Sequence, residues 1–68
     1  MPGTYKTTEL IGTSPVSFAE ATKAAVTEAA KTIRHIDWFE VVEMSGKIND
    51  GKVEEFQVRL KIAFKIER

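Results

Sequence analysis

Apolar and polar residues alternate almost without a break through the last quarter of the chain. From residue 56 onward every second position is large and apolar, and most positions between them are charged or polar. This period of two is typical of a β-strand with one buried face, and it predicts a strand over residues 53–66. The apolar positions are Phe56, Val58, Leu60, Ile62, Phe64 and Ile66.

Another strand-like run, residues 38–48, lies just before this one and is joined to it by Asn49, Asp50 and Gly51. Asp-Gly is a strong hairpin signal, because a tight turn between strands needs residues that accept positive φ. The second half of the chain is therefore predicted to be an antiparallel hairpin.

The first half predicts a strand followed by a helix. Residues 4–11 are rich in β-branched and aromatic residues and predict a strand, which residues 12–15 end. Residues 18–34 are alanine-rich and have the helical period. Ser17 and Glu20 match a capping box at the helix start, and Ser14 is a competing cap. The apolar stripe, whose alanines allow a close approach to the sheet, is Phe18, Ala21, Ala25, Val26, Ala29 and Ile33.

The predicted order is β-α-β-β, an α+β fold with a three-stranded antiparallel sheet and one helix on its apolar face. A helix of about 17 residues is about 25 Å long, whereas a strand of about 14 residues reaches about 46 Å. In the second strand Phe39 and Val41 alternate with Val42 and Met44, which predicts apolar side chains on both faces. Other copies of the chain are expected to cover this surface and the sheet edges.

Composition leads to the same expectation. The chain has 68 residues, enough for one domain (1–68), and it has no cysteine and one histidine. Disulfides and a structural zinc site are therefore excluded as means of stabilising a small core, which leaves self-association.

Ten acidic residues balance ten basic residues, which argues against a nucleic-acid partner. No apolar run approaches the ~20 residues that span a bilayer, so we expect a cytoplasmic protein without a membrane partner.

Three segments resemble the dodecin family along nearly the whole chain. They are Glu-Leu-Ile-Gly-Thr-Ser-Pro at 9–15, Arg-His-Ile-Asp-Trp-Phe-Glu-Val at 34–41, and Phe-Gln-Val at 56–58 with Lys-Ile-Ala-Phe at 61–64. In this order and at this chain length the three segments together are specific. The resemblance implies a hollow homododecamer whose sheets wrap partly around their helices. It also implies that flavins bind as stacked pairs at two-fold contacts between subunits.

The resemblance assigns the flavin ring to two residues. Trp38 stands where family members have the tryptophan that stacks on the isoalloxazine ring, and Gln57 stands where a glutamine hydrogen-bonds the polar edge of the ring. The side chains suit these roles, because an indole offers a flat, electron-rich face and a carboxamide offers both a donor and an acceptor. Without the resemblance, Trp38 would be interpreted as a core or interface anchor and Gln57 as a solvated strand residue.

The resemblance says less about which residues contact the phosphate of a flavin. Many family members carry an arginine seven residues after the stacking tryptophan, where it can meet the phosphate of FMN, but this chain has Ser45 there. Because a hydroxyl gives one neutral hydrogen bond instead of a charged fork, we expect riboflavin to bind at least as tightly as FMN. Lys6 and Lys65 could hold a phosphate instead, and the resemblance also makes coenzyme A a possible ligand.

The sequence-based hypothesis is a flavin store or scavenger that is not an enzyme. A flavoenzyme would need an open substrate site and a proton donor or base beside the ring, which a ring covered on both faces does not offer. The alternatives are an oligomeric module that binds coenzyme A or FMN, and a structural oligomer without flavin. His35 and Asp37 are interpreted as a helix-end residue and a turn residue, and Glu54 and Glu55 as a solvated face.

Overall fold

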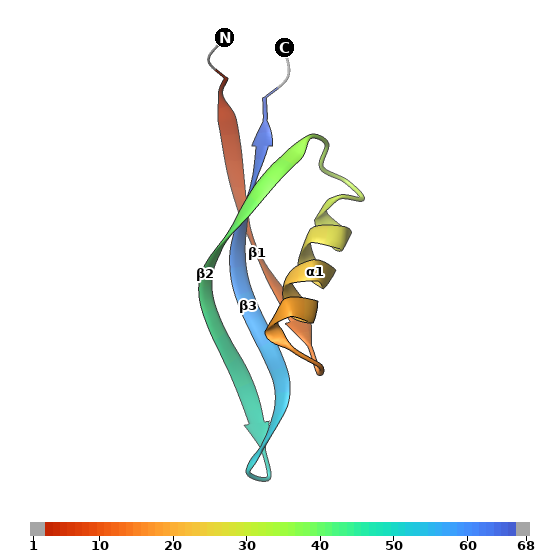
Figure 1. Ribbon diagram of the computed structural model, residues 1–68, viewed down its shortest axis with the longest axis vertical. Helices are drawn as coiled ribbons and strands as arrows, with labels where there is room; N and C mark the ends of the chain where they lie inside the picture. The colour runs from red at the N-terminus through yellow and green to blue at the C-terminus, as the bar shows by residue number, and fades with distance from the viewer. Residues whose placement is uncertain (1–2, 67–68) are drawn as a thin grey trace.

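The computed structural model describes residues 3–66, so the ends of the predicted domain, 1–2 and 67–68, lie outside the described residues. Strand β1 (Tyr5–Ser14) leads into helix α1 (Phe18–Ala29), and the hairpin of β2 (Ile36–Asn49) and β3 (Lys52–Lys65) follows (Figure 1). The three strands form one sheet in the order β1-β3-β2, and both pairings are antiparallel. The predicted β-α-β-β architecture is confirmed.

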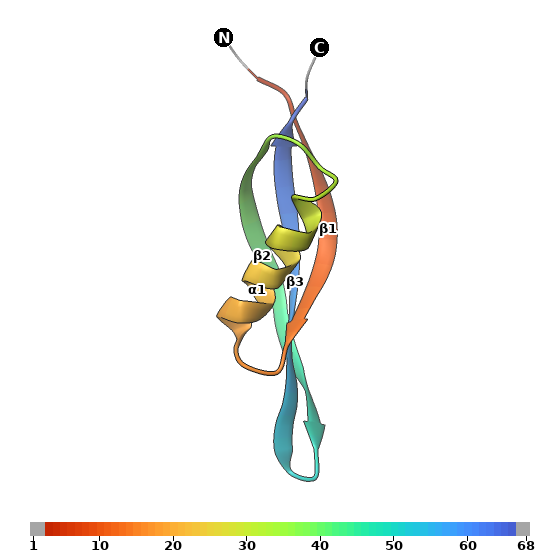
Figure 2. The same cartoon turned by 90° about the vertical axis from the view of Figure 1, so that its right-hand side faces the viewer.

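Helix α1 lies across one face of the sheet (Figure 2). Its contacts are mainly with β1 and β3, so β2 has little of the helix packed against it. The buried core forms between this helix and the middle strand, and its members are Ala21, Ala25, Val58, Leu60 and Ile62. The alanine stripe and the apolar face of β3 were therefore predicted correctly. A helix of 12 residues is about 18 Å long, whereas the molecule extends 53 Å along its long axis. Much of the sheet therefore has no helix over it.

Gly12 lets the helix approach β1 closely. A Cβ atom at this position would overlap the backbone carbonyl oxygen of Ala21 and lie 2.8 Å from the Cβ of Ala25. Both alanines belong to the buried core. The glycine in the strand and the alanines in the helix therefore act together, because larger side chains on either side would hold the two elements apart.

Helix α1 ends at Ala29, so the prediction that it continues to residue 34 was wrong. Beyond Ala29 two amides bond three residues back instead of four: Lys31 N–H to the Glu28 carbonyl and Thr32 N–H to the Ala29 carbonyl, both at 3.2 Å. This is the tighter pattern of a 3₁₀ turn. The β-branched residues Thr32 and Ile33, which follow it, favour a helix less than the alanines before them.

At the start of the helix the predicted cap is confirmed and its competitor is wrong. Ser17 is the N-cap, and its hydroxyl oxygen accepts a hydrogen bond from the Glu20 N–H at 3.0 Å. Ser14 instead belongs to β1, which runs three residues beyond the predicted end. Its hydroxyl oxygen accepts from the Val16 N–H at 3.0 Å and so holds the turn that leaves the strand.

The hairpin turn is as predicted, with Asp50 and Gly51 at φ values of 58° and 75°. Strict alternation along β2 is wrong, however, because the register shifts between Val41 and Glu43. Val42 is the extra residue of this β-bulge, and the bulge brings Met44 to the same face as Val41. Val41 and Met44 pair with Leu60 and Val58 of the core, so both lie on the helix face.

No helix in the part of the chain that the structure describes is long and apolar enough to cross a bilayer.

Candidate functional site

A second β-bulge decides where Trp38 lies. Ile36 pairs with Phe64, but Trp38 pairs with Ala63, so Asp37 is an extra residue in β2. Directly paired residues of an antiparallel sheet point to the same face, and Ala63 alternates with the core residue Ile62. Trp38 therefore lies on the face away from the helix, which we call the outer face. Without the bulge at Asp37, the indole would share the helix face with Ile36.

The Trp38 indole packs against the ring of Tyr5 across the middle strand. The ring centroids are 4.9 Å apart and the planes are inclined at 56°. Tyr5 on β1 pairs with Lys65 of β3, and Trp38 on β2 pairs with Ala63, so the two rings meet over β3 between these two positions. Ala63 is only 1% exposed, and its small side chain leaves room for the contact. Trp38 remains 44% exposed, so the indole is supported by Tyr5 and still open to a ligand.

Asp37 acts on the hydroxyl of Tyr5. Hydrogen bonding to the Asp37 carboxylate and the negative charge of that group raise the pKa of Tyr5 above its ordinary value of 10.0. Asp37 was predicted only as a turn residue, and no role was predicted for Tyr5. In the structure Asp37 acts on Tyr5, and Tyr5 in turn packs against the indole.

The Tyr5 contact predicts a measurable titration. Tyr5 is the only tyrosine, so the rise of phenolate absorbance with pH reports on this residue alone. We expect its pKa to exceed 10.0 in the folded protein and to fall toward 10.0 in Asp37→Asn, which removes the charge. Since the folded-state pKa is raised, the contact stabilises the fold below pH 10 and is lost as the pH rises through the raised pKa. Glu40→Gln is the control, because Glu40 does not contribute to the shift; equal titration curves for Asp37→Asn and the parent would contradict the assignment.

Gln57 also lies on the outer face, as its alternation with Val58 predicted. Its carboxamide is held at both ends: the Ser45 hydroxyl donates to Oε1 at 3.1 Å, and Nε2 donates to Glu55 Oε1 at 3.2 Å. Ser45 stands directly opposite Gln57 in the β2–β3 pairing. The structure thus brings together two residues that the sequence assigned to different parts of the ligand, and it adds Glu55, which the sequence placed on a solvated face.

Within one chain Trp38 and Gln57 lie far apart along the outer face. Trp38 pairs with Ala63, which is six residues along β3 from Gln57, a distance of about 20 Å. This distance exceeds the length of a three-ring isoalloxazine. This separation favours a site to which two copies of the chain contribute, one with Trp38 and the other with Gln57.

The residues predicted to contact a flavin phosphate lie in two separate regions of the sheet. Ser45 lies beside Gln57, whereas Lys6 and Lys65 line a cavity of about 620 Å³ at the other end of the sheet, together with Arg34. Lys65 is two residues beyond Ala63 on β3, so its backbone is about 7 Å along the strand from the position opposite Trp38. Of the candidate cations, Lys65 is therefore placed nearest to the indole.

Arg59 occupies the middle of the outer face and is engaged with two carboxylates. Its Nε lies 3.4 Å from Glu43 on β2, and its guanidinium lies 4.0 Å from Glu9 on β1. Within residues 3–66, no group of three or more histidine, cysteine, aspartate and glutamate side chains is placed to hold a metal ion.

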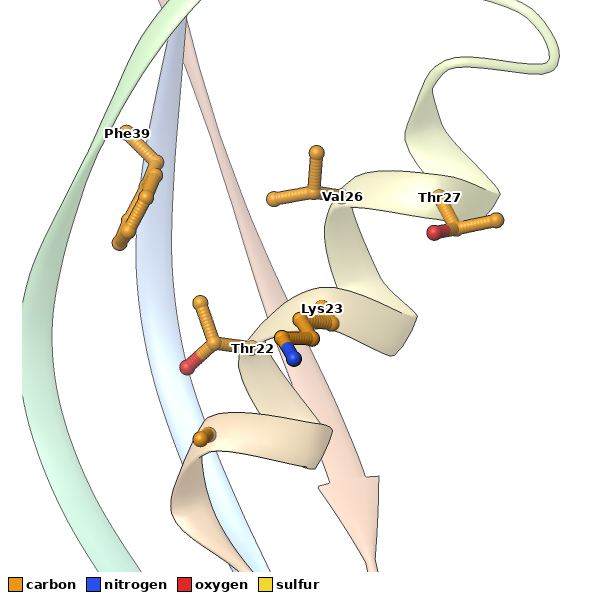
Figure 3. Close-up of a pocket in the computed structure, with 6 residues that line it drawn as sticks. Thr22, Lys23, Val26, Thr27 and Phe39 are labelled. Atoms are coloured by element: carbon orange, nitrogen blue, oxygen red, sulfur yellow. The ribbon is translucent and has the colours of Figure 1, made fainter.

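A groove of about 580 Å³ opens on the helix face between α1 and β2 (Figure 3). Thr22 and Val26 project from the helix toward the strand that carries Phe39, which is 48% exposed. The lining is mostly apolar and includes none of the residues that the sequence assigned to a ligand; it consists of Ala19, Thr22, Lys23, Val26, Thr27 and Phe39.

Comparison with known proteins identifies the family and agrees with the fold. The family model described as Dodecin matches residues 4–67. A dodecin from Thermus thermophilus is 48% identical over 93% of this chain and 91% of its own length. The structure of dodecin from Streptomyces coelicolor superposes with a TM-score of 0.93 at 47% identity and covers 97% of this chain and 94% of that one. A calcium dodecin from Mycobacterium tuberculosis is more distant, with a TM-score of 0.81 at 31% identity over 94% of this chain and 91% of that one. The chain belongs to the dodecin family.

Proposed function

We propose that this protein binds and stores flavins, quenches their excited state and catalyses no reaction. The observation that carries the proposal is the half-exposed indole of Trp38, which the Asp37 bulge turns to the outer face and which Tyr5 supports. An electron-rich indole stacks favourably on an electron-poor ring. It also gives an excited flavin a fast route to decay by electron transfer, so that light does less damage to the stored cofactor.

The proposed site is shared between subunits. Since about 20 Å separates the outer-face positions of Trp38 and Gln57 in one chain, the ring that stacks on one copy's Trp38 receives the Gln57 amide of another copy. A ring enclosed in this way leaves no room for a second substrate beside it, which is why storage is favoured over redox catalysis. Lys65, close to Trp38 along β3, is the cation best placed for a flavin phosphate.

Titration of the apoprotein with riboflavin and FMN tests the proposal. Flavin fluorescence should fall on addition of protein and reach a plateau at a fixed flavin-to-chain ratio. Because Ser45 replaces the arginine common in the family, riboflavin should bind at least as tightly as FMN, and Lys65→Gln should weaken FMN binding selectively in a salt-dependent way. Protein that leaves the fluorescence of both flavins unchanged would disprove flavin storage.

The same proposal includes a homododecamer. Phe39, Val41 and Met44 on the helix face of β2 are each 46–58% exposed, and a chain of this size gains stability by covering such a surface. Light scattering should give a mass near twelve times 7.6 kDa. A stably folded monomer at micromolar concentration would contradict this assembly.

A further inference from the structure

Four polar side chains form a continuous network on the outer face near the hairpin. Ser45 Oγ donates to Gln57 Oε1 at 3.1 Å, and Gln57 Nε2 donates to Glu55 Oε1 at 3.2 Å. The same Glu55 oxygen lies 3.9 Å from Lys47 Nζ. Glu55 and Gln57 are two residues apart on β3, and Lys47 and Ser45 are their direct partners on β2. Gln57 is thus held from across the sheet and along its own strand.

The chemistry of these partners fixes which way the carboxamide points. A carboxylate only accepts hydrogen bonds, so Glu55 requires the amide nitrogen of Gln57 on its side. The amide oxygen must then face Ser45, whose hydroxyl rotates to donate. If the amide flipped, its oxygen would face the Glu55 carboxylate and one hydrogen bond would become a repulsion between two acceptors. Lys47 lies on the other side of the same Glu55 carboxylate.

The network leaves part of the amide free for a ligand. A carboxamide has two N–H donors and two lone pairs on its oxygen, and Ser45 and Glu55 use one lone pair and one donor. One donor and one acceptor remain, in a fixed order: the oxygen toward β2 and the nitrogen toward the hairpin end of β3. The polar edge of an isoalloxazine carries an N3–H between two carbonyl groups, so a fixed amide pairs with N3–H and with only one of the two carbonyls.

We propose that Ser45 and Glu55 are positioning residues that hold the Gln57 carboxamide in one orientation and thereby select for flavins with a free N3–H. This inference rests on the proposed function, in which Gln57 contacts the polar edge of the flavin. Ser45 acts in ring recognition through Gln57, in addition to being the position that lacks the family's common arginine.

Discrimination between two ligands tests the inference. Riboflavin and N3-methylriboflavin share the stacking surface, but only riboflavin donates from N3. The parent protein should prefer riboflavin by about 3- to 10-fold, the ratio that one added hydrogen bond gives. Glu55→Gln should bring this ratio close to one, since the new side chain can donate as well as accept and so lets the amide turn. Ser45→Ala should lower the ratio, since it removes the hydrogen bond that holds the amide oxygen. Ser45→Thr, which keeps a hydroxyl, should restore the preference.

Glu54→Gln is the matched control. It removes the same charge one residue away, at a position that takes no part in the network, and should leave the ratio as in the parent. A purely structural role for Ser45 or Glu55 would weaken both ligands equally and leave the ratio unchanged, which would overturn the inference. If Glu55→Gln does not fold, Ser45→Ala and Ser45→Thr decide the question alone. Failure of the parent to bind riboflavin at all would instead refute the proposed function.

Discussion

Replacing Trp38 with alanine should weaken riboflavin binding by about 1–3 kcal/mol for each ring that stacks on an indole, the range measured for aromatic side chains on bases. Flavin that still binds should regain fluorescence, because the electron donor beside the ring is gone. The measurement is a fluorescence titration of the variant and the parent, which gives affinity and residual brightness in one experiment. A variant that binds and quenches as the parent does would show that the indole is not the stacking surface.

Phe39→Ala provides a matched control for Trp38→Ala. The two aromatic residues are neighbours in the sequence and similarly exposed, at 48% and 44%. They lie on opposite faces of the sheet, since Phe39 pairs with the core residue Ile62 and Trp38 with Ala63. Loss of Phe39 should leave the brightness of bound flavin unchanged in particles of parental mass, which separates removal of an aromatic ring in general from removal of the outer-face indole.

Replacing Gly12 with alanine should destabilise the fold by about 1–3 kcal/mol, the usual cost of extra volume in a packed core. The added Cβ would overlap the Ala21 carbonyl oxygen, which belongs to the helix backbone and cannot move by a change of rotamer. The helix would have to move away from β1 as a unit. Chemical denaturation at a fixed protein concentration measures the effect, because the stability of an oligomer depends on concentration.

Gly3→Ala is the control for this prediction. A Cβ at Gly3 would come no closer than 3.4 Å, to the flexible side chain of Lys65, so the free energy of unfolding should change little. Equal stability of Gly12→Ala and the parent would mean that β1 and α1 pack less closely in solution than in this structure.

The order of elements and the buried face of β3 could be predicted because they depend on local patterns. Between Glu55 and Lys65 the alternation of β3 is unbroken, so the outer-face position of Gln57 followed directly from the neighbouring apolar residues. The end of the helix was harder to predict. The helical spacing of apolar residues continues through Ile33, whereas the backbone changes to a tighter turn after Ala29.

The face occupied by Trp38 could not be predicted, because a β-bulge has no strong sequence signal. One extra residue at Asp37 reverses the face of every residue that follows it, until Val42 introduces the next shift. The contributions of Tyr5 and Glu55 were missed for another reason. Tyr5 meets Trp38 only because β3 lies between β1 and β2, and strand order is a property of the whole sheet. In the sequence Glu55 cannot be distinguished from its neighbour Glu54, because both are glutamates at the start of β3. Only the pairing of Glu55 with Lys47 in the sheet separates the two.

The contact between Tyr5 and Trp38 gives the molecule an intrinsic optical reporter. Tyr5 and Trp38 are its only tyrosine and its only tryptophan, and their ring centroids are 4.9 Å apart. At such a separation, light absorbed by the phenol is transferred to the indole and emitted at the longer wavelength of tryptophan. Because the two residues stand on the two edge strands, this transfer persists only while both edges remain attached to β3. The time at which tyrosine emission appears during unfolding would therefore show when an edge strand leaves β3, without any label or bound flavin.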